Sequence, residues 1–121
     1  MSPLHFEVAP SRNLQGQFVF LGTGTSVGVP VVGCSCDVCT SDDTKNQRTR
    51  TSVAFGLPDG TLLIDTTPDL RSQLLREQIG SIDAIVYTHD HVDHVYGLDD
   101  IRPLCFRKGG SLPVYCEPRV E

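Results

Sequence analysis

The features that direct a protein to a membrane, a secretory route or a nucleic acid are lacking in this sequence of 121 residues. No apolar run approaches the ~20 residues that a membrane span requires. The N-terminus has neither the basic region nor the apolar stretch of a secretory signal, so we expect a cytoplasmic location and no membrane partner. The net charge of −5 gives no electrostatic reason to expect nucleic acid as a partner.

The sequence also lacks internal repeats and low-complexity segments. Its 39% apolar and 21% charged residues are typical of an ordinary globular protein. A chain of this length can form one domain with a modest core. We predict that residues 17–121 form this domain and that residues 1–16 are a peripheral N-terminal segment.

The five cysteines are odd in number and three of them lie close together, which does not resemble a secreted disulfide framework. Cys34, Cys36 and Cys39 have the compact spacing of a zinc knuckle, in which thiolates bind a structural zinc ion. The alternative is that these are buried or redox-labile cysteines. The fourth ligand stays open, and the candidates within the chain are Cys105, Cys116 and His5.

Short apolar or alternating runs between turn residues predict the strands. They lie at residues 18–21, 51–55, 61–65, 83–87 and 112–116. The turn sequence Pro58-Asp59-Gly60 joins the second and third strands into a hairpin. Strands with interspersed helices indicate an α/β or α+β fold.

Two helices are predicted between these strands. The first has Thr67 as its N-cap and ends at Gly80. Its apolar face comprises Leu70, Leu74, Leu75 and Ile79. The second covers residues 94–102 and ends because Pro103 disfavours its continuation.

The segment of residues 88–94, THDHVDH, holds three of the four histidines of the chain. Because side chains alternate in an extended segment, His89, His91 and Asp93 share one side of it. His94 can reach the same cavity if a helix begins there. Imidazole and carboxylate groups suit Zn²⁺, Mn²⁺ or Fe²⁺, so the segment predicts a metal site. The alternative is a polar surface loop in which the histidines are a coincidence.

The pattern His89-x-His91-x-Asp93-His94, after an apolar strand, resembles the signature of the metallo-β-lactamase-fold hydrolases. LGTGT at residues 21–25 is similar to that family's first strand and loop, and LLID at residues 62–65 to the strand carrying its aspartate beside the metal ligands. Residues 33–39 and 94–100 resemble the phosphodiesterases that include 5-phosphoribosyl 1,2-cyclic phosphate phosphodiesterase. Protein B of pyrroloquinoline quinone biosynthesis shares the cysteine pattern. The resemblance covers residues 17–118.

The resemblance implies an αββα four-layer sandwich with two similar halves, of which this chain would form the N-terminal half. It implies that His89 and His91 bind one divalent ion, and that Asp93 and His94 bind a second. Asp93 is also assigned as a catalytic residue. Asp65 would accept a hydrogen bond from a ligand histidine and so fix its tautomer.

The implied activity is hydrolysis of a small cyclic or diester phosphate by a phosphodiesterase. Two ions, zinc or manganese, would hold a hydroxide that attacks phosphorus and would neutralise the phosphoryl oxygens. The family completes its site with further histidines and an aspartate from later segments, whereas His5 is the only other histidine here. We therefore expect this chain alone to be inactive. We also expect its sheet to expose an apolar face through which it forms a homodimer or binds a partner.

Two other functions remain open from the sequence. A tRNA 3′-processing endonuclease shares the histidine motif and a similar Gly-Thr-Gly loop, although the acidic charge and the cysteine cluster disfavour it. The chain could instead be a non-catalytic metal-binding module whose sheet pairs with another protein. The loop of residues 22–28, or Arg48 and Arg50, could bind a phosphate, but a tight solvated loop is the favoured interpretation.

Overall fold

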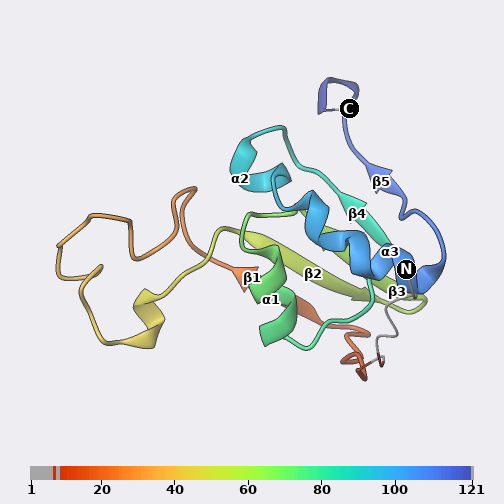
Figure 1. Cartoon of the computed structure of the whole chain (residues 1–121), viewed down its shortest axis with the longest axis horizontal. Coiled ribbons are helices and arrows are strands. Elements are labelled where there is room, and N and C mark those ends of the chain that lie inside the picture. Colours follow the sequence, from red (N-terminus) through yellow and green to blue (C-terminus); the bar gives the residue numbers. More distant parts are fainter. Residues whose placement is uncertain (1–6, 8, 121) are drawn as a thin grey trace, which may run out of the picture.

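A mixed five-stranded β-sheet organises the chain, with its strands in the order β1-β2-β3-β4-β5 (Figure 1). The computed structural model describes residue 7 and residues 9–120. The strands are β1 (Phe18–Gly22), β2 (Ser52–Leu57), β3 (Gly60–Ile64), β4 (Ala84–Val86) and β5 (Val114–Tyr115). Pairing is antiparallel from β1 to β3, which confirms the predicted hairpin, and parallel from β3 to β5.

The part of the chain that the structure describes contains three α-helices and three 3₁₀ turns. They are α1 (Leu70–Arg76), α2 (Val92–Val95), α3 (Arg102–Lys108), η1 (Thr44–Asn46), η2 (Leu98–Ile101) and η3 (Pro118–Val120). Parallel strands cannot be joined by a tight turn, so α1 lies on the crossover from β3 to β4, and α2, η2 and α3 lie on the next. In Figure 1, α1 and α3 lie in front of the sheet. The predicted combination of strands and interspersed helices is confirmed.

The core lies between these helices and one face of the sheet. Its main aliphatic residues are Leu21, Ala54, Leu63 and Ile85 in the strands and Leu70, Leu74 and Leu104 in the helices. Burial of a leucine or isoleucine side chain contributes roughly 1.5–3 kcal/mol. This packing holds the helices, and the segments attached to them, at a fixed position on the sheet.

The opposite face of the sheet is apolar and open. The Phe18 ring contacts Phe20 and Phe55 edge-on, with ring centroids 5.3 and 5.7 Å apart. Phe18 is 53% exposed and Phe20 is 63% exposed, and none of the described helices packs over them. The exposed apolar face expected from the sequence is thus present, while association through it stays a prediction.

The ends of β3 and β4 meet at one edge of the sheet because these two strands are parallel. The Thr66 N–H donates to the His94 carbonyl oxygen (2.8 Å), and the Gly97 N–H donates to the Thr66 carbonyl oxygen (3.0 Å). The buried Thr66 hydroxyl donates to the Val95 carbonyl oxygen (3.1 Å) and accepts from the Tyr87 hydroxyl (2.7 Å). Burial raises the pKa of Tyr87, which keeps this phenol protonated as a donor. The segments after β3 and β4 are therefore joined into one framework.

Helix α1 is shorter than predicted. The Thr67 hydroxyl accepts a hydrogen bond from the Asp69 N–H (3.1 Å), as an N-cap would, but the helix begins only after Asp69. The helix ends early because Gln78 adopts a left-handed conformation (φ 56°), so the prediction that Gly80 stops it is wrong.

The predicted apolar face of this helix is also partly wrong. Leu70, Leu74 and Ile79 are buried, whereas Leu75 is 62% exposed. Adjacent residues on a helix point about 100° apart, and here Leu74 faces the core while Leu75 points to solvent.

The single helix predicted over residues 94–102 is wrong. Its residues are divided among α2, η2 and the start of α3. Pro103 lies in the first turn of α3, where its missing N–H needs no partner, so it begins a helix instead of ending one. The last strand, β5, is shorter than the predicted 112–116.

The predicted peripheral segment is only partly described, since residues 1–6 and 8 lie outside the described residues. Over residues 9–16, Leu14 is buried in the core at 2% exposure and the other side chains are exposed. The boundary at residue 16 stays a prediction. Within the described ranges, 7 and 9–120, no helix has both the length and the apolar character needed to cross a membrane.

Asp83 connects the start of β3 to α3. Its carboxylate accepts a hydrogen bond from the Thr61 N–H (2.7 Å) and pairs with the Lys108 ammonium. The Lys108 side chain, assisted by the Thr61 N–H, holds the pKa of Asp83 below its ordinary value. Because the folded-state pKa is depressed, the stabilisation is present above the unfolded pKa of about 3.9 and is lost as pH falls through the folded value.

We expect D83N to lower the free energy of unfolding in urea at neutral pH by less than about 1 kcal/mol, since the ion pair is partly exposed. Asparagine can still accept from the Thr61 N–H, so the change isolates the charge. The difference from the parent should vanish once the pH lies below the folded pKa of Asp83. D42N alters an exposed carboxylate for which no hydrogen bond is described, and it should have no effect at either pH. An equal loss for D83N at both pH values would contradict the ion-pair explanation.

We expect G97A to destabilise the framework behind the histidine motif. A Cβ on Gly97 would lie 1.8 Å from the Thr67 carbonyl oxygen, so the backbone must move. Overpacking of this kind costs roughly 1–3 kcal/mol, measurable as a lower urea midpoint. Gly110 is the matched control, because a Cβ there meets no atom within 4 Å. Equal midpoints for G97A and G110A would show that the close approach has no energetic consequence.

Candidate metal centre

The four predicted metal ligands come together at the edge where β3 and β4 end. His89 and His91 lie in the loop after β4, and Asp93 and His94 lie on α2. The ring centroids of His89 and His94 are 4.1 Å apart, and those of His89 and His91 are 4.5 Å apart. The His89 ring thus lies between those of His91 and His94, with His91 exposed, while the role of the four residues as metal ligands stays a prediction.

The potential ligand atoms of this cluster form two pairs. His89 Nε2 lies 3.1 Å from His91 Nδ1, and His94 Nε2 lies 3.1 Å from Asp93 Oδ2. Two tetrahedral ligands that bind one ion at ~2.1 Å are about 3.4 Å apart. Each pair is therefore close to the spacing that a shared ion requires.

His94 lies between two carboxylates. Its Nδ1 is 2.7 Å from Asp65 Oδ2, and its Nε2 is 3.1 Å from Asp93 Oδ2. A neutral imidazole carries only one N–H, which the closer Asp65 accepts. His94 Nε2 and Asp93 Oδ2 then direct lone pairs at each other, and a cation between them relieves that repulsion. The donor set and its charge therefore fit a divalent metal ion.

Asp65 supports this cluster from beneath. It is 4% exposed and its backbone is left-handed (φ 63°), a conformation that aspartate tolerates better than most residues. Its Oδ1 accepts from the Thr88 N–H (2.8 Å), and its Oδ2 accepts from the Thr88 hydroxyl (2.7 Å) and from His94 Nδ1–H (2.7 Å). Three hydrogen bonds thus occupy most of the acceptor sites of the carboxylate, and ligand atoms of Asp65, His89 and His94 lie within 4.8 Å of one another. That Asp65 orients a ligand histidine stays a prediction.

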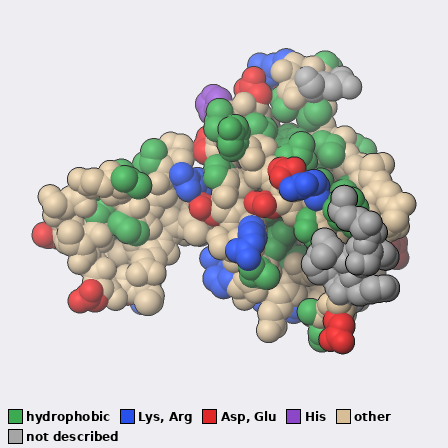
Figure 2. All heavy atoms as spheres, viewed as in Figure 1, with side chains coloured by type: hydrophobic (Ala, Val, Ile, Leu, Met, Phe, Trp, Pro, Cys, Tyr) green, Lys and Arg blue, Asp and Glu red, His purple; other side chains and the backbone are tan. Residues whose placement is uncertain are grey.

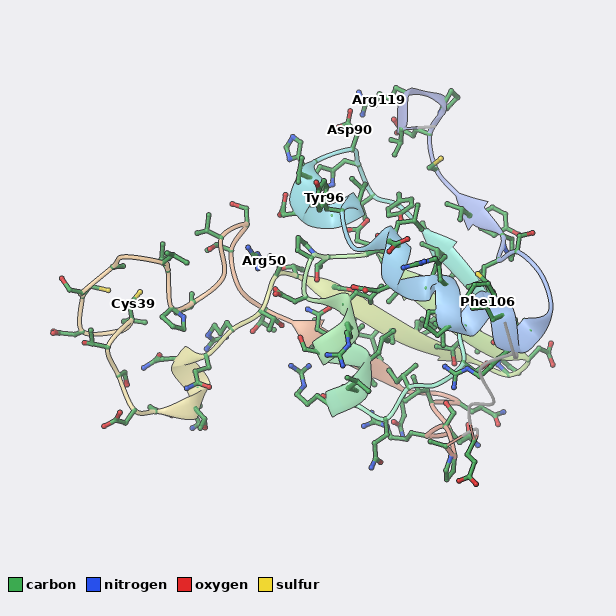
Figure 3. All side chains as sticks on the ribbon, viewed as in Figure 1. Cys39, Arg50, Asp90, Tyr96, Phe106 and Arg119 are labelled. Atoms are coloured by element: carbon green, nitrogen blue, oxygen red, sulfur yellow. The ribbon has the colours of Figure 1, made fainter. Side chains whose placement is uncertain are left out.

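The three clustered cysteines lie in the segment between β1 and β2, residues 23–51. This segment forms a lobe that projects from the sheet, on the left in Figures 1 and 2. The Sγ atoms of Cys34, Cys36 and Cys39 lie within 4.8 Å of one another. The Val31 N–H donates to Cys39 Sγ (3.3 Å) and fixes one side of the group. In Figure 3 the lobe with Cys39 is well separated from Tyr96, which directly follows α2, so the two candidate sites are distinct.

No fourth ligand joins the thiols among the described residues. Cys105 is half-buried against the core on α3, and the exposed Cys116 follows β5. His5, the third candidate, lies outside the described residues. Three converging thiols supply three corners of a tetrahedral zinc site.

The thiols of the lobe differ in acidity. The Cys39 backbone N–H, together with hydrogen bonds to the Cys34 and Cys39 side chains, lowers the pKa of Cys36 to about 7. The Val31 N–H lowers the pKa of Cys39, but burial and the neighbouring thiols outweigh it, and the net pKa is raised. Cys36 is therefore the thiol of this pair that ionises more readily, and the thiolate is the form that binds metal.

The two arginines considered for phosphate binding have partners inside the chain. Arg50 pairs with Asp69 (3.0 Å) and donates to the Ser26 carbonyl oxygen (3.2 Å), and Arg48 donates to the Thr23 hydroxyl (3.0 Å). Figure 3 shows Arg50 at the junction between the lobe and the sheet. The contacts with Ser26 and Thr23 tie the loop after β1 to the segment before β2, and the contact with Asp69 ties that segment to the start of α1.

The sequence did not identify Thr66, Tyr87 or Thr88 as site residues. Each is a hydroxyl residue next to a predicted strand end or motif residue, and that position was the only available signal. Their hydrogen bonds to Asp65, Val95 and each other become evident only once β3 and β4 are paired.

The chain is similar to several known proteins in sequence. A family model described as the β-lactamase superfamily domain matches residues 61–121. The octanoyltransferase of Porphyromonas gingivalis is 50% identical over 103 residues, covering 84% of this chain and 20% of that protein. The coenzyme PQQ synthesis protein B of Methylorubrum extorquens (strain PA1) is 33% identical over 117 residues, covering 84% of this chain and 37% of that protein. The chain thus spans only a fifth to somewhat over a third of these relatives' lengths.

Solved structures are similar over most of the chain. A diphosphatase of the PhnP family shares 52% identity with a TM-score of 0.81, covering 85% of this chain and 42% of that one. Zn²⁺-bound PqqB from Methylobacterium extorquens shares 30% identity with a TM-score of 0.69, covering 85% of this chain and 38% of that one. The metallo-β-lactamase-fold protein YhfI of Bacillus subtilis, at 19% identity and a TM-score of 0.54, agrees in fold.

We expect the cysteine lobe to bind Zn²⁺ or Co²⁺ through its thiolates. C36S should weaken Co²⁺ binding roughly tenfold or more, measured by thiolate-to-cobalt charge-transfer absorption, because it removes a ligand. C116S changes an exposed cysteine outside the lobe and should leave the absorption unchanged. Equal titration curves for the two variants would exclude the lobe as the thiolate site.

Proposed function

Because the chain belongs to the β-lactamase superfamily, we propose that it carries the first part of the active site of a metal-dependent phosphodiesterase for small cyclic or diester phosphates. The observation that supports this most directly is the placement of His94 between two carboxylates, beside a second pair of ligand atoms. The fold, a mixed five-stranded sheet with helices, agrees with metallo-β-lactamase-fold neighbours over about 85% of the chain.

In this proposal His89 Nε2 and His91 Nδ1 hold one divalent ion, zinc or manganese, and His94 Nε2 and Asp93 Oδ2 hold the other. When bound, the two ions supply activation of a water molecule and neutralisation of the phosphoryl oxygens. Asp93 is the catalytic carboxylate of this chain. Asp65 holds the His94 ring so that Nε2, and not Nδ1, faces the ion.

Each pair offers two ligands, whereas zinc sites of this type take three or more protein ligands. We propose that the remaining ligands come from outside these 121 residues, and that the chain alone does not turn over substrate. The cysteine lobe, which lies apart from the cluster, is proposed to hold a structural zinc ion. The Zn²⁺ bound by PqqB, one of the similar structures, supports zinc as a metal for this chain.

The substrate class rests on the relatives. One similar structure is that of a diphosphatase, an enzyme that cleaves a phosphoryl compound, which agrees with attack at phosphorus. The octanoyltransferase of Porphyromonas gingivalis does not bear on the substrate, because this chain matches only 20% of that protein. The proposed substrate is a cyclic or diester phosphate. A diphosphate is the alternative substrate against which this proposal is tested.

The test joins residues 1–121 to the remaining part of the PhnP-family diphosphatase. With Mn²⁺ or Zn²⁺, this chimera should hydrolyse bis-p-nitrophenyl phosphate, and the 121-residue chain should not. H91A in the chimera removes a proposed metal ligand. It should therefore reduce the rate by more than the ~10–100-fold that is lost when a residue hydrogen-bonded to a ligand is removed. D90A, which changes the exposed carboxylate next to His91, is the matched control and should retain the rate.

A folded, metal-loaded chimera that cleaves a diphosphate but not the diester would contradict the proposed substrate class. Turnover by the 121-residue chain equal to that of the chimera would contradict the proposal that its site is incomplete. Equal rates for H91A and D90A would exclude the histidine cluster as the reaction centre.

A further inference from the structure

The hydroxyl of Thr88 lies between a carboxylate and an imidazole. Thr88 Oγ1 is 2.7 Å from Asp65 Oδ2 and 2.8 Å from His89 Nδ1. Thr88 itself is exposed, and the hydroxyl is its only polar side-chain group. The same carboxylate oxygen also receives His94 Nδ1–H at 2.7 Å.

The direction of these hydrogen bonds follows from which of the three groups, carboxylate, hydroxyl and imidazole, carries a proton to donate. An ionised carboxylate only accepts, so the single proton of the Thr88 hydroxyl points at Asp65 Oδ2. The hydroxyl oxygen then offers a lone pair to His89, and His89 Nδ1 must carry a proton to complete the contact. In a neutral ring this leaves His89 Nε2 without a proton, on the side of His91 Nδ1 (3.1 Å).

We infer that Thr88 is a positioning residue that transmits the effect of Asp65 to His89, so that one buried carboxylate sets the tautomers of two histidines. It acts on His94 directly and on His89 through the threonine hydroxyl. Both rings then present Nε2 to the metal positions. The inference rests on the proposed function for its role, but the tautomers themselves are properties of the metal-free chain.

The arrangement also accounts for a hydroxyl at position 88. The Thr88 backbone N–H already binds Asp65 Oδ1 (2.8 Å), so residue 88 would be held in place without its side chain. The side chain adds the one contact that distinguishes the two nitrogens of His89. Rings whose other nitrogen is hydrogen-bonded are oriented and are better ligands, and loss of such a partner costs about 10–100-fold in metal affinity.

The experiment measures imidazole ¹⁵N shifts in the metal-free chain with labelled histidine, at about pH 8, above the ordinary histidine pKa of about 6.5. Signals are assigned with H89A, H91A and H94A. In the parent chain and in T88S, His89 should be the Nδ1–H tautomer. In T88V, which keeps size and the backbone hydrogen bond but lacks the hydroxyl, His89 should lose this preference while His94 keeps it.

A second readout follows Mn²⁺ binding by the electron spin resonance of the free ion, since this metal prefers nitrogen and oxygen ligands to the thiolates of the lobe. T88V should weaken binding about tenfold, and T88S should restore it. The inference would be overturned if His89 of the parent chain were protonated at Nε2. It would also be overturned if the His89 tautomer were the same in T88V as in the parent chain. Neither outcome depends on whether the chimera hydrolyses a diester, so failure of the proposed function remains distinguishable.

Discussion

The three hydrogen bonds accepted by the Asp65 carboxylate are the interactions on which the candidate site depends. They join the chain leaving β3 to Thr88 and His94, which follow β4. A carboxylate that is 4% exposed is costly unless it is paired, by several kcal/mol for an isolated ion. The fold therefore satisfies Asp65 with the same groups that orient the histidines, and stability and site geometry are coupled.

Much of the fold was predictable because its signals are periodic or local. The alternating segments and the turn at residues 58–60 predicted the β2–β3 hairpin, and the apolar run before the histidines predicted β4. The errors arose where one residue type allows two outcomes. Pro103 is compatible with either end of a helix, and the adjacent Leu74 and Leu75 gave no local indication of which one would face the core. Nothing in the local sequence distinguishes Gln78 as the residue that turns left-handed.

The candidate site shows the same division between local and long-range information. The motif residues were identified because three histidines and a carboxylate fall within a few positions, and Asp65 through the resemblance of LLID at residues 62–65 to a known family. Thr88 was not identified, since the value of its hydroxyl depends on a carboxylate 23 positions earlier in the sequence. The grouping of the thiols was evident from spacing because Cys34 to Cys39 lie within a single turn-rich segment, whereas a partner from elsewhere in the chain leaves no such pattern.

The parallel pairing of β3 with β4 has a consequence for the order in which the two metal-binding regions form. The contact between Asp65 and His94 joins residues 29 positions apart and requires the α1 crossover to be complete. Non-local parallel pairing is slow, because the entropy of closing the intervening loop is lost before the contacts form. The thiols of the lobe come together within the single segment from Cys34 to Cys39 and need no such crossover. We therefore expect the thiol group to take its shape before the histidine cluster does during folding, so that the two regions become able to bind metal at different times.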